Sequence, residues 1–166
     1  MTVLRERLLE GRTIALDRRA PDAVRHALEG LGATVDAGVP PDALVFDAAA
    51  GFGEGGLEGL SAALGDAWAA ISEVVAGELI PAGRPGKVVL LAPRPGAGPF
   101  AEGARAALEN LARTLSVEWA RYAVTAVAIA PGEETTDEHV AELVCYLLSP
   151  AGDYFSGCRF ELGAAA

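Results

Sequence analysis

The chain has 166 residues, of which 51% are hydrophobic and 22% are charged, and its formal net charge is −10. This length suits one domain, and the apolar fraction excludes a disordered protein because it can offset the entropy of ordering. An acidic chain with scattered basic residues is a poor partner for nucleic acid or an anionic membrane surface. No apolar run reaches the roughly 18 residues that a membrane span needs, the first residues lack the apolar core of a signal peptide, and two cysteines are too few for a disulfide framework. We therefore expect one cytoplasmic domain over residues 1–166.

Short apolar runs alternate along the chain with segments of helical period. In chain order, the predicted strands are 13–17, 33–36, 43–48, 87–92, 124–129 and 159–162, and the predicted helices are 21–31, 60–79, 101–121 and 137–148. Such alternation is typical of a parallel sheet covered by helices. The pattern predicts a Rossmann-like three-layer α/β sandwich, with a mostly parallel sheet of about six strands and helices on both faces.

Five blocks of sequence occur in an order that is typical of one enzyme family. They are residues 42–49 (DALVFDAA), 86–91 (GKVVLL), 104–120, 127–132 (VAIAPG) and 139–157. These blocks resemble the motifs D-x-L-V-N-N-A-G, G-x-I-V-x-I-S-S, S-K-A-A-L-x-x-L…L-A-x-E-W-A, V-N-x-I-A-P-G and E-D-V-A…F-L-L-S…Y-I-T-G of the short-chain dehydrogenases/reductases (SDRs). The resemblance covers most of the chain and implies a Rossmann fold and a family of NAD(P)-dependent oxidoreductases.

The cofactor positions of that family depart from its pattern. The family has a glycine-rich turn after the first strand, because only a bare backbone can approach the pyrophosphate at the helix N-terminus. Here that turn is 17–21 (DRRAP), without a glycine. Asp36 lies where the family's NAD-selecting acid would be, and without the turn we interpret it as a strand-end residue. Thr135 or Thr136 matches the threonine that contacts the nicotinamide amide, which alone cannot hold a dinucleotide. We expect no cofactor and a lost NAD(P) site.

The catalytic positions of the family are also changed. The resemblance places Ala101 at the proton-donating tyrosine and Arg105 at the lysine four residues later. The serine position falls at Ala92 or Pro93, and the family's asparagine has no counterpart because Asn110 is the only asparagine in the chain. A residue without an acidic proton cannot protonate a carbonyl oxygen. The sequence therefore predicts a shortened, catalytically degenerate SDR with no catalytic residues and no activity by itself.

The two long predicted helices, 60–79 and 101–121, keep their apolar surface. Helix 60–79 is apolar on nearly all sides, whereas a surface helix needs one apolar stripe. In the family the equivalent pair packs against the same pair of another subunit, and an uncovered surface of this kind would be a large apolar patch. We predict a non-catalytic subunit that forms a homodimer, or a heteromer with a catalytic SDR subunit, through Trp68, Ile71, Val75, Leu108, Leu111, Leu115 and Trp119.

Two alternatives stay open. One is a cofactor-independent enzyme or ligand-binding protein that uses the emptied crevice, with Asp47 as acid or base and Arg105 as an anion holder. The other is a residual NAD(P)-binding reductase or sensor. Arg18 and Arg19 could hold an anion at a helix N-terminus, although we expect a solvated turn.

The remaining residues of chemical interest are assigned to structure. His26 and His139 are expected on helix surfaces, because neither has a nucleophile or metal-ligand spacing nearby. Cys145 falls on the apolar side of the last helix and is expected to be a packed small hydrophobe. Nothing in the pattern predicts that Cys158 is reactive. No metal site is predicted.

Overall fold

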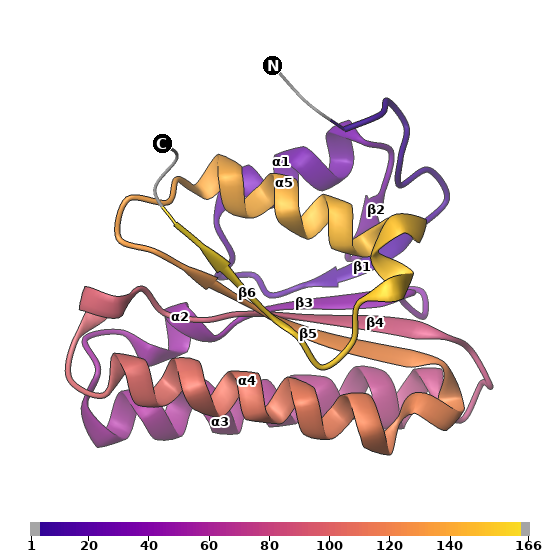
Figure 1. The fold of residues 1–166 in the computed structure, drawn as a ribbon. Helices are drawn as coiled ribbons and strands as arrows, with labels where there is room; N and C mark the ends of the chain where they lie inside the picture. The colour runs from indigo at the N-terminus through magenta and orange to yellow at the C-terminus, as the bar shows by residue number, and fades with distance from the viewer. Residues whose placement is uncertain (1–3, 164–166) are drawn as a thin grey trace.

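One six-stranded parallel sheet forms the centre of the computed structural model, which describes residues 4–163 (Figure 1). The strand order is β2-β1-β3-β4-β5-β6, and all neighbours pair in parallel. The strands are β1 (Thr13–Leu16), β2 (Thr34–Val35), β3 (Ala43–Asp47), β4 (Gly86–Leu91), β5 (Val124–Pro131) and β6 (Arg159–Leu162). The predicted fold class, a Rossmann-like α/β sandwich of six strands, is confirmed.

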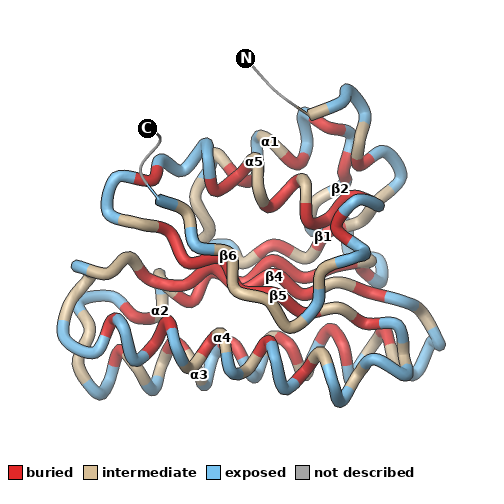
Figure 2. The backbone as a smooth tube through the Cα atoms, in the orientation of Figure 1, coloured by how far each residue is buried: buried red, intermediate tan, exposed pale blue. Residues whose placement is uncertain are grey.

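Helices cover both faces of this sheet. Helices α1 (Asp22–Gly30) and α5 (Asp137–Leu148) lie above it in Figure 1, and α3 (Gly56–Ile71) and α4 (Ala101–Glu118) lie below. Each face has its own apolar core, to which the covering helices and alternate strand residues contribute. The central strands are buried in Figure 2 because both of their faces are covered, which explains their continuous apolar runs.

Two elements differ from the prediction. A short helix, α2 (Ala48–Phe52), follows β3 directly; it was not predicted because five residues are too few to show a helical period. The predicted helix 60–79 begins earlier, at Gly56, and changes at Ser72 into a π-helix that ends at Leu79. The prediction of four helices is therefore wrong by one, although every predicted helix exists.

The strand order reverses between β1 and β3, and we call the region between the carboxyl ends of these two strands the crevice. The chain leaves β1 toward β2 on one side and leaves β3 toward β4 on the other, so the winding reverses at this point. In open α/β sheets, ligands bind at the carboxyl ends of the two strands that flank such a reversal. Strand β2 forms the sheet edge, and residues 36–42 return across β1 to β3 without a helix.

The loops at the carboxyl edge are packed closely against one another. Gly98 has a φ of 145°, and a Cβ there would lie 2.2 Å from the carbonyl oxygen of Glu54. Only glycine allows this approach between the loops that precede α4 and α3. Within residues 4–163, no helix combines the length and the apolar character that a membrane span needs.

Candidate functional site

Asp47 ends β3 at the crevice. Its carboxylate accepts hydrogen bonds from the backbone N–H groups of Ala49 (2.9 Å) and Ala50 (3.3 Å), and so caps α2. The residue is 6% exposed. Burial raises the pKa of Asp47 to about 6, and the negative charge of Asp17 adds to this rise, whereas the two N–H groups oppose it. Asp47 is therefore a helix cap with an unusually basic carboxylate.

Arg19 lies in the turn after β1 and reaches across the crevice to α3. Its Nη2 donates to Asp17 Oδ2 at 3.0 Å and its Nη1 donates to Asp66 Oδ2 on α3 at 3.2 Å. The guanidinium carbon also lies 5.6 Å from the centroid of the Phe46 ring. The neighbouring Arg18 is exposed, as expected for a solvated turn, but Arg19 is held by the protein itself.

Arg105 lies inside the carboxyl edge of the sheet. It is 1% exposed, and its Nη1 donates to the carbonyl oxygens of Pro93 (2.8 Å) and Pro131 (2.7 Å). Its Nη2 donates to Glu161 Oε1 at 3.3 Å. These partners follow β4, end β5 and belong to β6, respectively, so one guanidinium joins three strands. Its Nε lies 3.3 Å from a carboxylate oxygen of Glu102 without forming a hydrogen bond.

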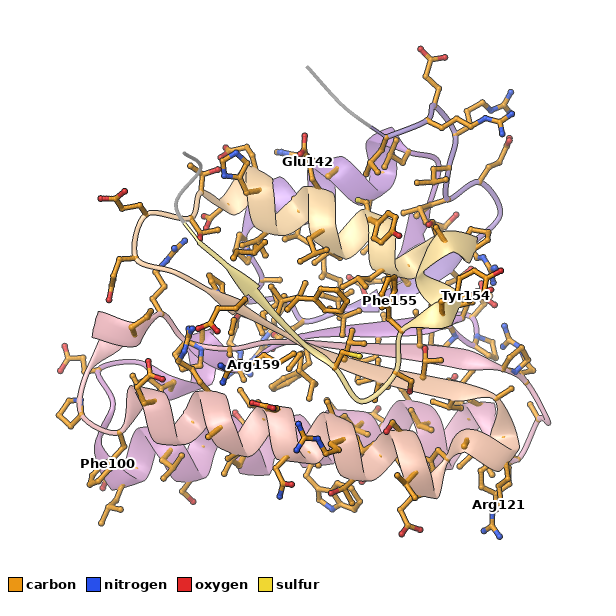
Figure 3. All side chains as sticks on the ribbon, in the orientation of Figure 1. Phe100, Arg121, Glu142, Tyr154, Phe155 and Arg159 are labelled. Carbon is orange, nitrogen blue, oxygen red and sulfur yellow. The ribbon has the colours of Figure 1, made fainter. Side chains whose placement is uncertain are left out.

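Two other positions of the catalytic motif, Ala101 and Ala92, are also buried. Ala101 and Ala92 are 3% and 2% exposed, and both belong to the core beneath the sheet. Figure 3 shows Phe100 at the start of α4 and at the end of the helix layer, where its ring is 54% exposed. A ring without a hydroxyl offers no acid, so these positions supply no proton donor.

The two threonines of the nucleotide pattern also bind within the protein. Thr135 is 4% exposed; its Oγ1 accepts from the N–H of Gly132 and donates to the carbonyl of Leu162, both at 3.0 Å. Thr136 Oγ1 caps α5 by accepting from the N–H of His139 at 3.3 Å. Both hydroxyls therefore stabilise the loop between β5 and α5.

Arg94 also bonds within the carboxyl edge of the sheet, and no motif in the sequence pointed to it. Its Nη1 donates to the carbonyl of Gly132 at 2.6 Å, and its Nη2 lies 3.2 Å from Asp137 on α5. A second link joins the same loops, from the N–H of Gly96 to the carboxylate of Glu133. The one signal for Arg94 in the sequence was its position, two residues after the predicted strand 87–92.

Asp36 also forms structural contacts. Its carboxylate accepts from the backbone N–H of Leu16 at 3.0 Å and from Arg25 Nη2 at 2.9 Å. These bonds fix the end of β2 against β1 and α1, which agrees with the interpretation of Asp36 as a strand-end residue.

The structure does not bring Asp47 and Arg105 together. Asp47 caps α2 at the end of β3, whereas Arg105 bonds to groups at the ends of β4, β5 and β6. No hydrogen bond or ion pair joins the two among residues 4–163. The predicted acid–anion pair is therefore not a site, because Arg105 has its own buried partners.

The histidines and cysteines take the positions that the sequence predicted. His26 and His139 are exposed, and Cys145 is fully buried. Burial raises the pKa of the Cys145 thiol to about 12, so it is not a nucleophile at neutral pH. Over the described range 4–163, no cluster of His, Cys, Asp and Glu could hold a metal ion.

The predicted interface residues divide into two groups. Ile71, Val75, Leu108 and Leu115 are at most 3% exposed and pack in the core beneath the sheet. They cannot contact another subunit, so this part of the prediction is wrong; helical period alone does not tell which of two apolar sides faces the sheet. Trp68 is 52% exposed, and Leu111 and Trp119 are half-buried.

The outer face of α3 and α4 carries few charges. Its exposed members include Ser61, Gly65, Trp68, Ala69, Ala106, Asn110, Thr114 and Val117. The charged residues from Ser61 to Ser72 and from Gly103 to Glu118 are Asp66, Arg105, Glu109, Arg113 and Glu118, and all of these except Glu118 are engaged in ion pairs. We define these eight exposed residues as the outer helix face.

No protein-family model and no curated protein matches the sequence, whereas 1034 chains of solved structures match the fold. The citronellol catabolism dehydrogenase AtuB of Pseudomonas aeruginosa PAO1 has a TM-score of 0.78 and 20% identity, over 99% of this chain and 98% of that one. An NAD(P) dependent gluconate 5-dehydrogenase of Beutenbergia cavernae, with bound NADP at low occupancy, has a TM-score of 0.74 and 19% identity, over 92% of this chain and 95% of that one. BdcA (YjgI) of E. coli has a TM-score of 0.68 and 17% identity, over 93% of this chain and 100% of that one.

The fold and the reversal point define a doubly wound, Rossmann-like α/β protein. More particularly, the three similar structures are short-chain dehydrogenases/reductases, so the chain has an SDR-like fold, as the sequence motifs predicted. At 17–20% identity this likeness concerns the fold. Function has to be argued from the site.

Proposed function

We propose that this protein is a non-catalytic, SDR-like subunit that assembles through the outer helix face. The observation that carries the proposal is the buried guanidinium of Arg105, which lies at the lysine position of the motif and donates to the carbonyl oxygens of Pro93 and Pro131. A lysine in the SDR pattern holds a ribose and lowers the pKa of a tyrosine. Here the equivalent cation stabilises the edge of the sheet, next to an alanine at position 101.

The crevice residues do not fit a pyridine dinucleotide. The neighbour from Beutenbergia cavernae contains NADP, but in this chain Asp17 and Asp47 place two carboxylates at the crevice, and Arg19 crosses it to α3. A pyrophosphate there would be repelled by the carboxylates and would meet side chains where glycines are needed. These features support a lost NAD(P) site.

The outer helix face supports assembly. Interfaces are depleted in charge at their centres and enriched in aromatic residues, and small residues allow two helix pairs to approach closely. Trp68 and Val117 are 52% and 73% exposed on a surface whose other members are small or uncharged. We infer that a second copy, or an intact SDR subunit with a matching helix pair, covers this face, since two-fold interfaces are self-complementary.

Light scattering coupled to size exclusion tests the assembly. We expect a dimer at low micromolar concentration, and a monomer for Trp68→Arg, because a buried unpaired charge at an interface centre costs several kcal/mol (roughly 2–5 kcal/mol). Tyr154→Arg is the matched control: it changes an aromatic residue that is 90% exposed and lies outside the outer helix face, so the dimer should persist.

A monomer for the unmodified chain leaves the heteromer to be tested. Titration with a purified, intact SDR subunit should then give a complex that Trp68→Arg abolishes and Tyr154→Arg retains. Absence of both complexes overturns the assembly. Reduction of a carbonyl compound with NADH or NADPH by the purified chain overturns the non-catalytic assignment and favours a residual reductase. Cytoplasmic location stays a prediction of the same proposal.

A further inference from the structure

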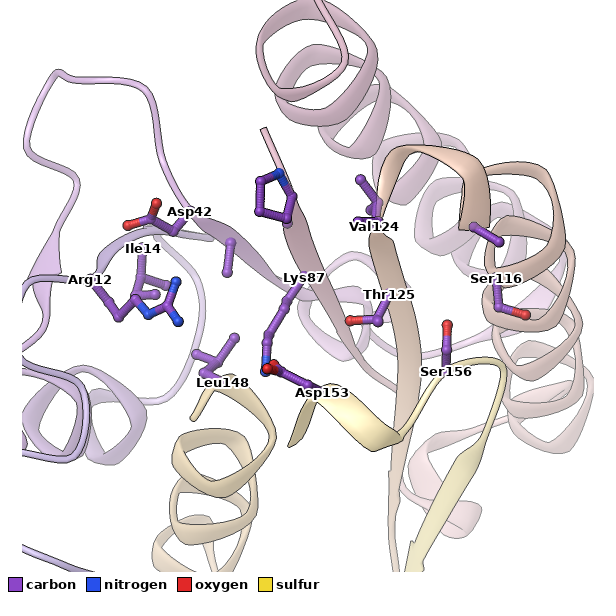
Figure 4. Close-up of a pocket in the computed structure, with 15 residues that line it drawn as sticks. Arg12, Ile14, Asp42, Lys87, Ser116, Val124, Thr125, Leu148, Asp153 and Ser156 are labelled. Atoms are coloured by element: carbon purple, nitrogen blue, oxygen red, sulfur yellow. The ribbon is translucent and has the colours of Figure 1, made fainter. Parts of the chain in front are cut away.

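A cavity lies at the opposite, amino-terminal edge of the sheet (Figure 4). Its volume is about 460 Å³, and its walls come from the segment before β1, the first residues of β4 and β5, and the turn after α5. In Figure 4, Arg12, Lys87 and Asp153 lie on one side and Thr125, Ser116 and Ser156 on the other. This cavity is separate from the crevice between the carboxyl ends of β1 and β3.

Lys87, the only lysine of the chain, has all its donors engaged. Its Nζ donates to the carbonyl oxygens of Leu147 at 3.0 Å and Ser149 at 2.6 Å, and lies 2.5 Å from Asp153 Oδ1. The ammonium group therefore caps the last turn of α5 and pairs with one carboxylate. It supplies a positive field to the cavity but no free donor.

Arg12 differs from Lys87, because its guanidinium has no hydrogen bond or ion pair with any residue in the range 4–163. It is half-buried and lines the cavity. The other arginines of that range without an ion pair are all exposed: Arg5, Arg18 and Arg121. Burial lowers the pKa of Lys87, and the nearby positive charge of Arg12 lowers it further. An anion beside Arg12 would relieve this repulsion.

The acidic residues around the cavity are already paired. Asp42 Oδ1 lies 2.7 Å from Arg84 Nη2, and its Oδ2 accepts from the N–H of Thr13 at 2.8 Å. Asp153 holds Lys87. The guanidinium fork of Arg12 is therefore the free charged group, and a fork of this kind matches a carboxylate in two parallel hydrogen bonds.

We propose that this cavity binds a small organic monocarboxylate, with the carboxylate on Arg12 and an apolar body against the exposed lining residues Pro85, Ala120 and Ala123. One unpaired cation compensates one negative charge, and the carboxylates of Asp42 and Asp153 disfavour a dianion such as a phosphate ester. The apolar walls fit a hydrocarbon body, and the volume falls in the range of small-molecule sites. The proposal does not depend on the assembly through the outer helix face.

Calorimetric titration with benzoate, benzamide and inorganic phosphate tests the ligand class. Benzoate should bind, and the isosteric, uncharged benzamide should bind about tenfold or more weakly, since it loses the charge-assisted pair. Arg12→Gln should also weaken benzoate binding about tenfold or more, because it removes the charge. Arg12→Lys should weaken it by less, because a point charge replaces the guanidinium fork. Arg18→Gln, which removes an exposed arginine that also lacks an ion pair, is the matched control and should bind like the unmodified chain.

A second readout uses Lys87. Because it is the only lysine, its acetylation by acetic anhydride can be followed by mass spectrometry of one peptide. Benzoate should slow this acetylation in the unmodified chain, because a neighbouring anion raises the pKa of the ammonium group, and should not slow it in Arg12→Gln. Equal binding of benzoate and benzamide, phosphate binding as tight as benzoate, or benzoate binding unchanged in Arg12→Gln would each overturn the proposal.

Discussion

The two ends of the sheet differ in one half-buried arginine, although Arg84 at the amino end is also paired, with Asp42. At the carboxyl end, Arg19, Arg94 and Arg105 all bond to groups of the protein itself: carboxylates, backbone carbonyls and the ring of Phe46. At the amino end, Arg12 faces a cavity without a partner in the described part of the chain. In an open α/β sheet the carboxyl end is the usual ligand site.

This difference teaches that charged side chains at the usual ligand end of a sheet can serve to hold the fold together. Arg105 lies at the position of a motif lysine, yet its contacts join the ends of β4, β5 and β6. A cation that bonds to three strand ends stabilises the edge of the sheet. The following variants separate the two ends, beginning with the largest expected effect.

Arg105→Met removes the central tie of the carboxyl end. Two buried carbonyl oxygens, those of Pro93 and Pro131, lose their donor, and the free energy of unfolding should fall by about 3 kcal/mol, at about 1–3 kcal/mol for each orphaned group. Urea unfolding followed by circular dichroism measures this loss. Arg113→Ala is the control on the same helix: its pair with Glu109 is an exposed i,i+4 contact worth about 0.3–0.5 kcal/mol. Equal losses in the two variants would refute the role of Arg105 as a tie.

Asp47→Asn changes the pH dependence of stability. Because the folded-state pKa of Asp47 is about 6, above that of an unfolded aspartate, its contribution to stability is present below pH 4 and is lost as the pH rises through 6. Asparagine keeps an N-cap oxygen without the buried charge. We expect the variant to gain about 3 kcal/mol at pH 7.5 and almost nothing at pH 4, because the pKa rises from 3.8 to about 6 and each pKa unit corresponds to roughly 1.36 kcal/mol.

The measurement is urea unfolding at both pH values. Asp22→Asn, which changes an exposed carboxylate in the first turn of α1, should stay within about 0.5 kcal/mol of the unmodified chain at either pH. A loss of stability in Asp47→Asn at pH 7.5 would contradict the argument and would indicate that the charged cap is needed.

The sequence predicted the fold well because its signals are local. Strands β3 to β5 are apolar runs because helices cover them on both faces of the sheet. Helix α5 has the predicted bounds because Thr136 caps its first turn. The SDR-like motifs then fixed the family of folds, although α2 was missed because its five residues show no period.

The site could be predicted only in part, because its contacts are long-range. The positions of Ala101 and Arg105 predicted missing chemistry, but the bonds from Arg105 to Pro93, Pro131 and Glu161 span 12 to 56 residues. The same limit affected the interface: apolar residues at 71, 75, 108 and 115 are equally consistent with a core and a contact until the sheet is placed. Burial, rather than period, separates these two cases.

The smallest expected effect belongs to Arg19→Ala. Its side chain is 35% exposed, and its pairs with Asp17 and Asp66 should contribute less than about 1 kcal/mol, with a weak dependence on salt. The variant removes the side chain that crosses the crevice but leaves the turn 17–21 without glycines. Fluorescence titration with NADPH should therefore detect no saturable binding before or after the change, because an open crevice does not supply the backbone N–H groups that hold a pyrophosphate. Micromolar binding that appears only in Arg19→Ala would identify Arg19 as a plug over an intact nucleotide site, and the carboxyl end would then be closed by one side chain instead of lost.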